Sequence, residues 1–456
     1  MRVGHVAGRS ALVVGLGRSG RAAAFALHRA GAHVTVAERD ATADRGALPG
    51  DVAILVGRDD AGLLEGIDLV VPSPGVAEHT PLLQAALLVG LDVWSEPELA
   101  WRLRTSDTTR LAAVTGTNGK TTTTEMLAAC LQAQTAGNIG TPLVTVLTAE
   151  DPPPLVVAEL SSFQLRFTAS LRADVAVLRN VAPDHWDWHG GPDGYAAAKA
   201  RVWANQRAGD TAVVDADDAG AIAVLRDHPP GGHVVLHTMG PPPAGGVGVV
   251  DRALVADIAG TPTPLLAVDE LGAAGPHNAA NACAAAAAAL AAGAAPEQIA
   301  AALRAYRPGG HRMALVATRD GVDWVDDSKA TNPHAAAAAL RSYPSVVWIA
   351  GGLNKGLSFE DLAADLTGRV RAAVTIGASG PQIAALTRRM GIPTVEAGHL
   401  AAAVTAAAGL ARPGDTVLLA PACASMDQFT DYAHRGQAFT DAVAALAATT
   451  GDSHDH

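Results

Sequence analysis

The segment with the clearest chemical potential is a glycine-rich turn, Gly-Thr-Asn-Gly-Lys-Thr, at residues 116–121. An apolar run precedes it and a helical pattern follows it, so the turn lies between a strand and a helix amino terminus. Glycines let backbone N–H groups face an anion, and the helix dipole favours negative charge there. Lys120 would reach the outer phosphates of a nucleotide, and the Thr121 hydroxyl would face Mg²⁺. The pattern predicts an ATP site.

The spacing of this loop departs from the common P-loop. The common form places a glycine five residues before Gly119, where this chain has Val114, and the nearer glycine is Gly116. The loop is therefore a shortened variant. An ordinary glycine turn capped by a threonine is the alternative, and the strand-turn-helix context favours the phosphate site.

A second glycine turn, Gly-Leu-Gly-Arg-Ser-Gly at residues 15–20, follows the first strand-like run, and Glu38 ends the next one. This spacing matches the dinucleotide fingerprint and alone suggests a nicotinamide or flavin enzyme. A glycine turn at a helix amino terminus accepts any diphosphate, however, including that of a UDP-sugar. Residues 73–75, Ser-Pro-Gly, should lie at the same sheet edge. A nucleotide diphosphate is the predicted ligand, and a purely structural turn is the alternative.

Several ionisable side chains follow strand-like runs in the middle of the chain. Glu159 ends one run, where a carboxylate can approach Mg²⁺ or remain merely solvated. Residues 180–189 crowd polar groups between two tryptophans, and His185 is the favoured functional candidate there, with His189 peripheral. Lys199 lies in an alanine-rich helical pattern, where a lone lysine is usually a solvated charge.

Two lysine-bearing segments lie at predicted strand ends in the last third of the chain. They are residues 327–332, Asp-Ser-Lys-Ala-Thr-Asn, and residues 351–356, Gly-Gly-Leu-Asn-Lys-Gly. Ligands of α/β proteins bind at the carboxyl edge of the sheet. The two segments therefore indicate recognition of an anionic group.

The elements that position these residues follow an α/β rhythm, in which strand-like and helix-like runs alternate along the whole chain. A polar stretch at residues 104–110 and the Arg-Pro-Gly-Gly sequence at 307–310 mark two breaks. We therefore predict three α/β domains at residues 1–105, 106–308 and 309–456. The expected architectures are Rossmann-like, a P-loop ATPase-like parallel sheet, and Rossmann-like again.

Composition restricts the possible partners and compartment. The 456 residues are 49% hydrophobic and 17% charged, which suffices for several buried cores, and the net charge of −12 argues against a nucleic-acid surface. The three cysteines have no metal-like spacing, which fits a reducing cytoplasm. The sequence shows neither a signal peptide nor an apolar run of membrane-spanning length. We expect a cytoplasmic monomer that neither binds nucleic acid nor inserts into a membrane.

The motifs TGTNGKTT, ELSSFQL, NVAPDHWDWHG, the helix lysine, HNAANA, PGGHRM, DDSKATN and PACASMDQF occur in this order over essentially the whole chain. In this combination the chain resembles the Mur ligases, and within them the members that add D-glutamate. The resemblance implies ATP-dependent amide synthesis in peptidoglycan precursor formation. The carboxylate of UDP-N-acetylmuramoyl-L-alanine would take the γ-phosphate of ATP as an acyl phosphate, and the amine of D-glutamate would displace it. Two Mg²⁺ ions would offset the charge.

The resemblance also implies which residues bind the substrates. The residues implied for the UDP-substrate are Gly17, Arg18, Ser19, Gly20, Glu38, Arg39, Ser73, Pro74, Gly75, Asn138 and His185. Those implied for ATP are Gly116, Thr117, Asn118, Gly119, Lys120, Thr121, Thr122, Asn278, Arg312 and Asp327. Those implied for D-glutamate are Lys329, Thr331, Lys355, Ser425 and Phe429.

The catalytic residues implied by the resemblance are Lys120, Glu159, His185 and Lys199, and the metal ligands are Thr121, Glu159, His185 and Lys199. Lys199 matches the family's carbamylated lysine, which becomes an anion by reaction with CO₂. From the residue alone, Lys199 is interpreted as a solvated charge, whereas the resemblance makes it a catalytic residue and a metal ligand. Asn354 departs from the family pattern, in which an acidic residue is frequent at this position. This difference affects the geometry expected around Lys355.

Three alternatives remain open at this point. Another ligase of the same superfamily could join a different amino acid or extend folate with glutamate; the chain has PACASMDQF but lacks the Asp-Asn-Pro-Arg motif expected of a diaminopimelate-adding ligase. An NAD-dependent oxidoreductase would leave the loop at 116–121 without a purpose. A nucleotide-dependent switch or binding module would not need the set of acid, histidine and lysine side chains.

Overall fold

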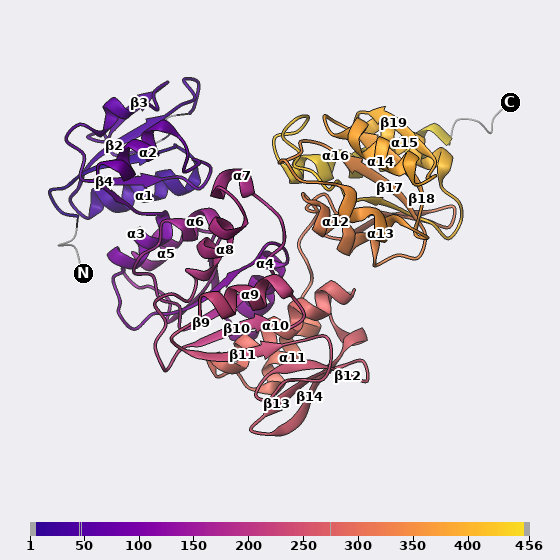
Figure 1. Cartoon of the computed structure of the whole chain (residues 1–456), viewed down its shortest axis with the longest axis horizontal. Helices are drawn as coiled ribbons and strands as arrows, with labels where there is room; N and C mark the ends of the chain where they lie inside the picture. The colour runs from indigo at the N-terminus through magenta and orange to yellow at the C-terminus, as the bar shows by residue number, and fades with distance from the viewer. Residues whose placement is uncertain (1–5, 45, 47, 274, 451–456) are drawn as a thin grey trace. The chain divides into compact units, whose positions relative to one another are not determined.

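The computed structural model describes residues 6–44, 46, 48–273 and 275–450, which form three β-sheets with flanking helices (Figure 1). The chain divides into two compact units, Met1–Val181 with Trp188–Tyr306, and Ala182–Asp187 with Arg307–His456. The first unit holds the N-terminal and central sheets, and the second holds the C-terminal sheet. The predicted α/β class with three sheets is confirmed.

The N-terminal sheet is entirely parallel, with strand order β3-β2-β1-β4-β5. This order matches the first five strands of the Rossmann order 3-2-1-4-5-6, as predicted. Its elements are β1 (Ser10–Val14), α1 (Arg18–Arg29), β2 (His33–Glu38), β3 (Ala53–Val56), η2 (Ala61–Leu64), β4 (Leu69–Pro72), α2 (Pro81–Leu88), β5 (Asp92–Val93) and α3 (Glu96–Leu103).

The central sheet has nine strands in the order β14-β13-β12-β11-β10-β9-β6-β8-β7. Strand β6 lies between β8 and β9, and helices cover it on both faces, which explains why its middle residues are all apolar and buried. The elements are β6 (Arg110–Thr115), α4 (Lys120–Leu131), β7 (Gln134–Gly137), α5 (Leu143–Leu147), β8 (Leu155–Glu159), α6 (Ser162–Arg166), β9 (Val175–Leu178), α7 (Trp186–His189), α8 (Pro192–Ala200), β10 (Thr211–Asp215), α9 (Ala219–Asp227), β11 (His233–His237), β12 (Val247–Val250), β13 (Ala253–Ile258), β14 (Thr261–Ala267), η3 (Val268–Glu270), α10 (Pro276–Ala292) and α11 (Pro296–Ala305).

One edge of the central sheet differs from the predicted parallel arrangement. Strand β13 pairs antiparallel with both β12 and β14. The turn between β13 and β14 is Ala259-Gly260, with positive φ at both residues, as in the tight hairpin turns that match strand twist. Pro262 and Pro264 are accommodated in β14, because a strand at the sheet edge tolerates residues without an N–H.

The alanine-rich run near residue 285 forms the middle of helix α10, which packs against α4, the helix after the phosphate loop. Residues 282–289 are all buried. Small side chains let two helices approach closely, and alanine has the best helix propensity. The run is therefore structural, and it places α10 beside the loop.

The C-terminal sheet has the order β15-β16-β20-β17-β18-β19, with β15 antiparallel to β16 and the other neighbours parallel. The carboxyl ends of β16, β20 and β17 are adjacent, and both lysine-bearing segments follow them. The elements are β15 (Ala314–Arg319), β16 (Val322–Asp326), α12 (Pro333–Leu340), β17 (Val346–Gly351), η4 (Glu360–Leu362), α13 (Ala363–Leu366), β18 (Val370–Ile376), α14 (Gly380–Arg389), β19 (Thr394–Gly398), α15 (Leu400–Leu410), β20 (Thr416–Leu419) and α16 (Tyr432–Thr450).

Within the described residues, no helix combines the length and apolarity that crossing a bilayer requires. Each of the three cysteines is buried with a free thiol. Burial raises the pKa of the Cys130 and Cys283 thiols to about 12, so these side chains act as small packing residues.

Candidate functional site

The predicted phosphate loop joins β6 to α4 and has the backbone that the glycine pattern requires. Gly116 has φ +151° and Gly119 has φ +78°, both in the region that favours glycine. A Cβ on Gly116 would lie 2.9 Å from the Cβ of Arg179, and one on Gly119 would overlap the Asn281 amide oxygen. Conformation and close packing therefore both require glycine at these two positions.

Asn180, the second residue after β9, holds the loop by hydrogen bonds. Its Oδ1 accepts from the Asn118 backbone N–H at 2.8 Å, and its Nδ2 donates to the Asn118 carbonyl at 3.1 Å. Its own carbonyl accepts from the Thr117 N–H at 2.9 Å. Sequence reasoning missed this role, although Asn180 opens the polar run at residues 180–189.

Two predicted lysines converge on the loop. Lys120 Nζ donates to the carbonyls of Gly116 at 3.0 Å and Thr117 at 2.9 Å, and Lys199 Nζ donates to the same Gly116 carbonyl at 2.7 Å. Lys199 is 1% exposed, so it is not the solvated charge that a lone helical lysine usually is. Two like charges on one carbonyl oxygen create a strongly positive spot beside the loop.

Tyr195, one turn before Lys199 on α8, joins this group. Its hydroxyl lies 3.0 Å from Thr117 Oγ1, and its ring centroid lies 4.5 Å from Lys199 Nζ, a cation–π distance. The tyrosine thus fixes both the loop and the lysine. Sequence reasoning missed Tyr195, and its i, i+4 spacing from Lys199 was the available signal.

Glu159 ends β8, next to β6, and is 1% exposed. Its Oε1 accepts from Asn138 Nδ2 at 2.6 Å, and its backbone carbonyl accepts from the Asn138 N–H at 2.9 Å. Its buried Oε2 has no hydrogen-bond partner among the residues that the structure describes. A buried carboxylate oxygen without a donor suits a cation ligand, because burying it otherwise costs free energy.

Thr121 and Thr122 lie in the first turn of α4 and are buried, and Asn278 lies in the first turn of α10. Asn278 Oδ1 accepts from Asn281 Nδ2 at 3.3 Å. The structure thus brings the central-domain residues predicted for ATP and metal to the carboxyl edge of one sheet.

The N-terminal glycine turn opens onto a cavity of about 610 Å³. The predicted residues that line it are Gly17, Arg18, Ser19, Glu38, Arg39, Ser73, Pro74, Gly75 and Asn138. Gly20 lies beneath the turn, where a Cβ would overlap the Gly15 carbonyl. The Glu38 carboxylate accepts from the backbone N–H groups of Leu16 at 2.7 Å and Asp40 at 3.0 Å, so it braces the turn.

In the second unit, the segment after β16 is tightly held. Asp327 Oδ1 accepts from the Met313 N–H at 3.2 Å, and burial raises the pKa of the Asp327 carboxyl to about 7, opposed by the nearby Arg312 charge. Lys329 Nζ lies 3.7 Å from the centroid of the Tyr432 ring. Thr331 follows two residues later, and its N–H donates to the Lys329 carbonyl at 2.8 Å.

Lys355, after β17, forms an ion pair with Asp184 at 3.3 Å. Asp184 is buried and also accepts from Asn332 Nδ2 at 3.2 Å, and it lies 3.5 Å from His185 Nε2. His185 has φ +51°, a conformation that is rare for a residue with a side chain. The sequence predicts His185 and Lys355 separately, and sequence reasoning missed Asp184, the residue that links them.

Ser425 and Phe429 belong to the loop after β20. Ser425 is buried, and its carbonyl accepts from the Phe429 N–H at 2.9 Å, while the Phe429 ring packs edge-on against His434. Arg435, 1% exposed, donates to the carbonyls of Ser328, Cys423 and Ala424. Burial lowers the pKa of the Arg435 guanidinium to about 10. The arginine ties together two of the three loops that carry the predicted D-glutamate residues, those after β16 and β20.

The predicted residues thus fall into two sets. The first unit holds Lys120, Thr121, Asn138, Glu159, Lys199 and Asn278. The second unit holds His185, Arg312, Asp327, Lys329, Thr331, Lys355, Ser425 and Phe429. Within the ranges that the structure describes, no three His, Cys, Asp or Glu side chains cluster as a metal site. Mg²⁺ bound with nucleotide phosphates typically needs only one or two protein carboxylates.

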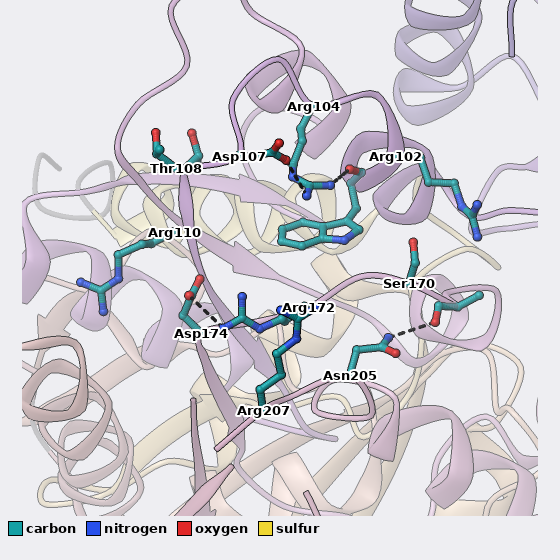
Figure 2. Close-up of a pocket in the computed structure, with 13 residues that line it drawn as sticks. Arg102, Arg104, Asp107, Thr108, Arg110, Ser170, Arg172, Asp174, Asn205 and Arg207 are labelled. Carbon is teal, nitrogen blue, oxygen red and sulfur yellow. Dashed lines mark hydrogen bonds and ion pairs between the residues drawn. The ribbon is translucent and has the colours of Figure 1, made fainter. Parts of the chain in front are cut away.

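A larger cavity, of about 850 Å³, lies at the amino edge of the central sheet and contains none of the predicted residues. Figure 2 shows two ion pairs in it, Arg104 with Asp107 at 2.8 Å and Arg172 with Asp174 at 3.8 Å. Arg172 also pairs with Asp210 through its Nε and Nη2. These ion pairs lie within the segment at residues 104–107 and among residues 172, 174 and 210.

Comparison with known families assigns the chain to a class. Residues 9–95 match the MurD-like N-terminal domain of Mur ligases, residues 114–289 the Mur ligase middle domain, and residues 311–423 the Mur ligase glutamate ligase domain. The chain belongs to the Mur ligase family and is an ATP-dependent ligase.

Relatives with a specific name are similar over nearly the full length. The UDP-N-acetylmuramoylalanine–D-glutamate ligase of Frankia casuarinae is 52% identical, over 96% of this chain and 94% of the relative. Ligases of the same name from Thermobifida fusca and Streptomyces coelicolor are 46% and 45% identical, each over 99% of the relative.

Solved structures of more distant members share the fold. The UDP-N-acetylmuramate–alanine ligase of Thermotoga maritima superposes with a TM-score of 0.60 at 18% identity, over 96% of this chain and all of that one. The MurF ligase of the same organism, solved with ADP, has a TM-score of 0.60 at 16% identity, over 98% of this chain and 97% of that one.

Proposed function

We propose that this ligase joins D-glutamate to UDP-N-acetylmuramoyl-L-alanine at the expense of ATP, in the cytoplasm, as a step of peptidoglycan precursor synthesis. The names of relatives up to 52% identical support the substrates. The observation that carries the chemistry is the position of Lys120, whose ammonium group donates to the Gly116 and Thr117 carbonyls of the phosphate loop. A positive charge at this position stabilises a triphosphate and the charge that develops during phosphoryl transfer.

The reaction has two steps. A carboxylate oxygen of the UDP-substrate attacks the γ-phosphorus of ATP, and ADP leaves. The amine nitrogen of D-glutamate then attacks the acyl carbon, phosphate leaves, and the nitrogen loses a proton to form the amide. A carboxylate is a poor acyl donor until its oxygen becomes part of a phosphate leaving group, which is why ATP is consumed.

Two residues of the first unit offer oxygen atoms that suit Mg²⁺. Glu159 Oε2 is a buried carboxylate oxygen without a protein donor among the described residues, and Thr121 offers a hydroxyl in the first turn of α4. These are the hard oxygen ligands that Mg²⁺ prefers. When bound, Mg²⁺ would offset charge on the phosphates and on the reacting carboxylate. We propose two such ions, with Lys199 and His185 serving the second.

Lys199 is proposed to carry a carbamate. The modification would replace a buried cation with an anion and would provide oxygen ligands for a metal. A carbamate nitrogen retains one N–H, so the 2.7 Å hydrogen bond to the Gly116 carbonyl can persist. The burial of Lys199 would also shield the carbamate from water.

The cations of the second unit suit D-glutamate, which carries two carboxylates. Lys329 and Lys355 each follow a strand end of the same sheet edge, and Ser425 and Thr331 add short hydroxyl side chains. Lys355 is paired with Asp184 at 3.3 Å, so a carboxylate of the ligand would compete with Asp184 for this ammonium group.

Two structural proposals accompany this function. The proposed domain boundaries fall between elements: 105/106 between α3 and β6, and 308/309 between α11 and β15. We also propose that the protein is a monomer, which sedimentation equilibrium would test directly.

The test is a parallel assay of ADP release with ATP, Mg²⁺ and UDP-N-acetylmuramoyl-L-alanine. D-glutamate, L-glutamate and diaminopimelate are supplied separately. We expect amino-acid-dependent ADP release and a new amide product only with D-glutamate. Equal turnover with diaminopimelate, or ADP release independent of any amino acid, would contradict the proposal.

A further inference from the structure

A buried arginine behind the phosphate loop has no part in the function proposed so far. Arg179 follows β9 directly and is 4% exposed. Its Nη1 donates to Asp215 Oδ2 at 2.7 Å and lies 3.1 Å from His237 Nε2. Asp215 and His237 end β10 and β11, so the guanidinium joins the carboxyl ends of three neighbouring strands.

The same guanidinium reaches helix α10. Its Nε donates to Asn281 Oδ1 at 3.1 Å, and Thr123 Oγ1 on α4 donates to the same oxygen at 3.3 Å. Two donors on one amide oxygen set which way the Asn281 side chain faces. Its Nδ2 then donates to Asn278 Oδ1, which orients the Asn278 amide in turn.

Asn281 also packs directly under the phosphate loop. A Cβ on Gly119 would overlap Asn281 Oδ1, and a Cβ on Gly116 would lie 2.9 Å from the Cβ of Arg179. Arg179 therefore contacts one loop glycine itself and the other through Asn281. A shift of the guanidinium would change the backbone on which a triphosphate must rest.

The electrostatics fix the arginine in this position. Burial, and secondly the Arg179 charge, hold the pKa of His237 well below its usual range, so His237 is neutral near pH 7 and accepts a hydrogen bond. Asp215 supplies the compensating negative charge at a buried site. A fork-shaped donor is needed because the partners lie on different elements, and a lysine has no such geometry.

We propose that Arg179 is a positioning residue for the nucleotide: it holds Asn281, and through Asn281 the phosphate loop and Asn278, in the arrangement that binds ATP. The proposal rests on the ATP site of the proposed function. A purely structural ion pair that closes the sheet edge is the competing explanation.

Arg172 provides a matched control. Arg172 lies just before β9, at the opposite edge of the same sheet. Like Arg179 it uses Nε and a terminal nitrogen as donors, but both of them bind one buried aspartate, Asp210. Arg179→Lys keeps a cation beside Asp215 but loses the second arm of the fork. Arg172→Lys makes the same change away from the loop.

The experiment measures Mg²⁺–ADP affinity by titration calorimetry, together with thermal unfolding and the KM values of all three substrates. We expect Arg179→Lys to weaken ADP binding about tenfold, as the loss of a hydrogen bond from a charged donor would, and to raise the KM for ATP alone. Arg172 is distant from the loop, so Arg172→Lys should leave the ADP affinity within about twofold of that of the parent protein. Unchanged ADP affinity in Arg179→Lys would overturn the proposal.

A double-mutant cycle tests the route through Asn281. If Arg179 acts through this side chain, the double variant Arg179→Lys with Asn281→Ala should bind ADP no more weakly than Asn281→Ala alone. Additive losses would overturn that route. Thr123→Val removes the other donor to Asn281 without touching the buried charge and should weaken ADP binding in the same direction. ADP binding by the parent protein without D-glutamate-dependent turnover would contradict the proposed function alone.

Discussion

At the scale of single residues, the chemistry is concentrated at the Gly116 carbonyl, where two lysine side chains meet. The two lysines have different burial and different positions, Lys120 at the start of α4 and Lys199 within α8. Their proposed roles can therefore be tested by separate substitutions.

Lys120→Met should remove the charge proposed to bind the outer phosphates while keeping most of the side-chain volume. We expect ADP release to fall at least a hundredfold and nucleotide affinity to fall about tenfold or more, because hydrogen bonds to charged groups are worth about 1.5–3 kcal/mol. Turnover and nucleotide affinity equal to those of the parent protein would exclude a phosphate-binding role.

Lys199→Ala should lose most activity, because it removes the proposed carbamate, and added formate or acetate should restore part of it by supplying carboxylate oxygens. The rescue is measured as ADP release against carboxylate concentration. Arg172→Lys serves as the control that should show no such response. Full activity of Lys199→Ala without any additive would rule out the carbamate.

The sequence predicts those site residues whose arrangement depends on near neighbours in the chain. The loop at 116–121 and the turn at 15–20 carry their own geometry in closely spaced glycines. Asn281 and Arg179 depend on contacts across about 100 residues of chain, which no local pattern reports. Lys199 looked like a surface charge because its helix gave no sign that it was fully buried.

At the scale of elements, the phosphate loop depends on how closely α10 approaches α4. The alanines of α10 permit this approach, and Asn281 fills the space under Gly119. The antiparallel edge formed by β12–β14 was not predictable, because short apolar runs do not reveal strand direction.

Gly119→Ala should destabilise the loop, because φ +78° disfavours a side chain and the new Cβ would meet Asn281. We expect a loss on the order of 1–3 kcal/mol in unfolding free energy, with weaker ADP binding. Gly409→Ala is the control: Gly409 lies inside α15 and a Cβ there would meet no other atom, so this variant should gain about 0.5–1 kcal/mol. Similar stabilities for the two variants would contradict this packing.

Glu96 links α3 to α5, since its Oε1 accepts from the Val144 N–H at 2.5 Å. Burial raises the pKa of this carboxyl to about 7 from a usual value of 4.5. The folded protein therefore holds the proton more tightly than the unfolded chain, and Glu96 costs stability increasingly as pH rises from about 4.5 to 7.

Glu96→Gln mimics the protonated form, so the variant should match the parent near pH 4 and be more stable above pH 7, on the order of 1–3 kcal/mol. Urea unfolding at several pH values measures the difference. A gain that is equally large at pH 4 would show that titration of Glu96 is not its source.

At the scale of the whole molecule, the predicted site residues are divided between two compact units. The residues proposed for nucleotide and metal lie mainly in the first, and those proposed for D-glutamate lie in the second, together with Asp184 and His185. The division is consistent with the fold, because ligands of α/β proteins bind at the carboxyl edge of a sheet and each unit contains such an edge. The three-sheet architecture was predictable from the alternation of strand and helix patterns; the transfer of residues 182–187 to the second unit was not.

In the proposed reaction, ATP phosphorylates the carboxylate of the UDP-substrate before D-glutamate attacks. The most direct test of this step uses UDP-N-acetylmuramoyl-L-alanine labelled with ¹⁸O in the alanine carboxylate, followed by mass analysis of the phosphate released. We expect one ¹⁸O atom in inorganic phosphate for each amide formed. Phosphate without ¹⁸O, with amide still produced, would contradict this step.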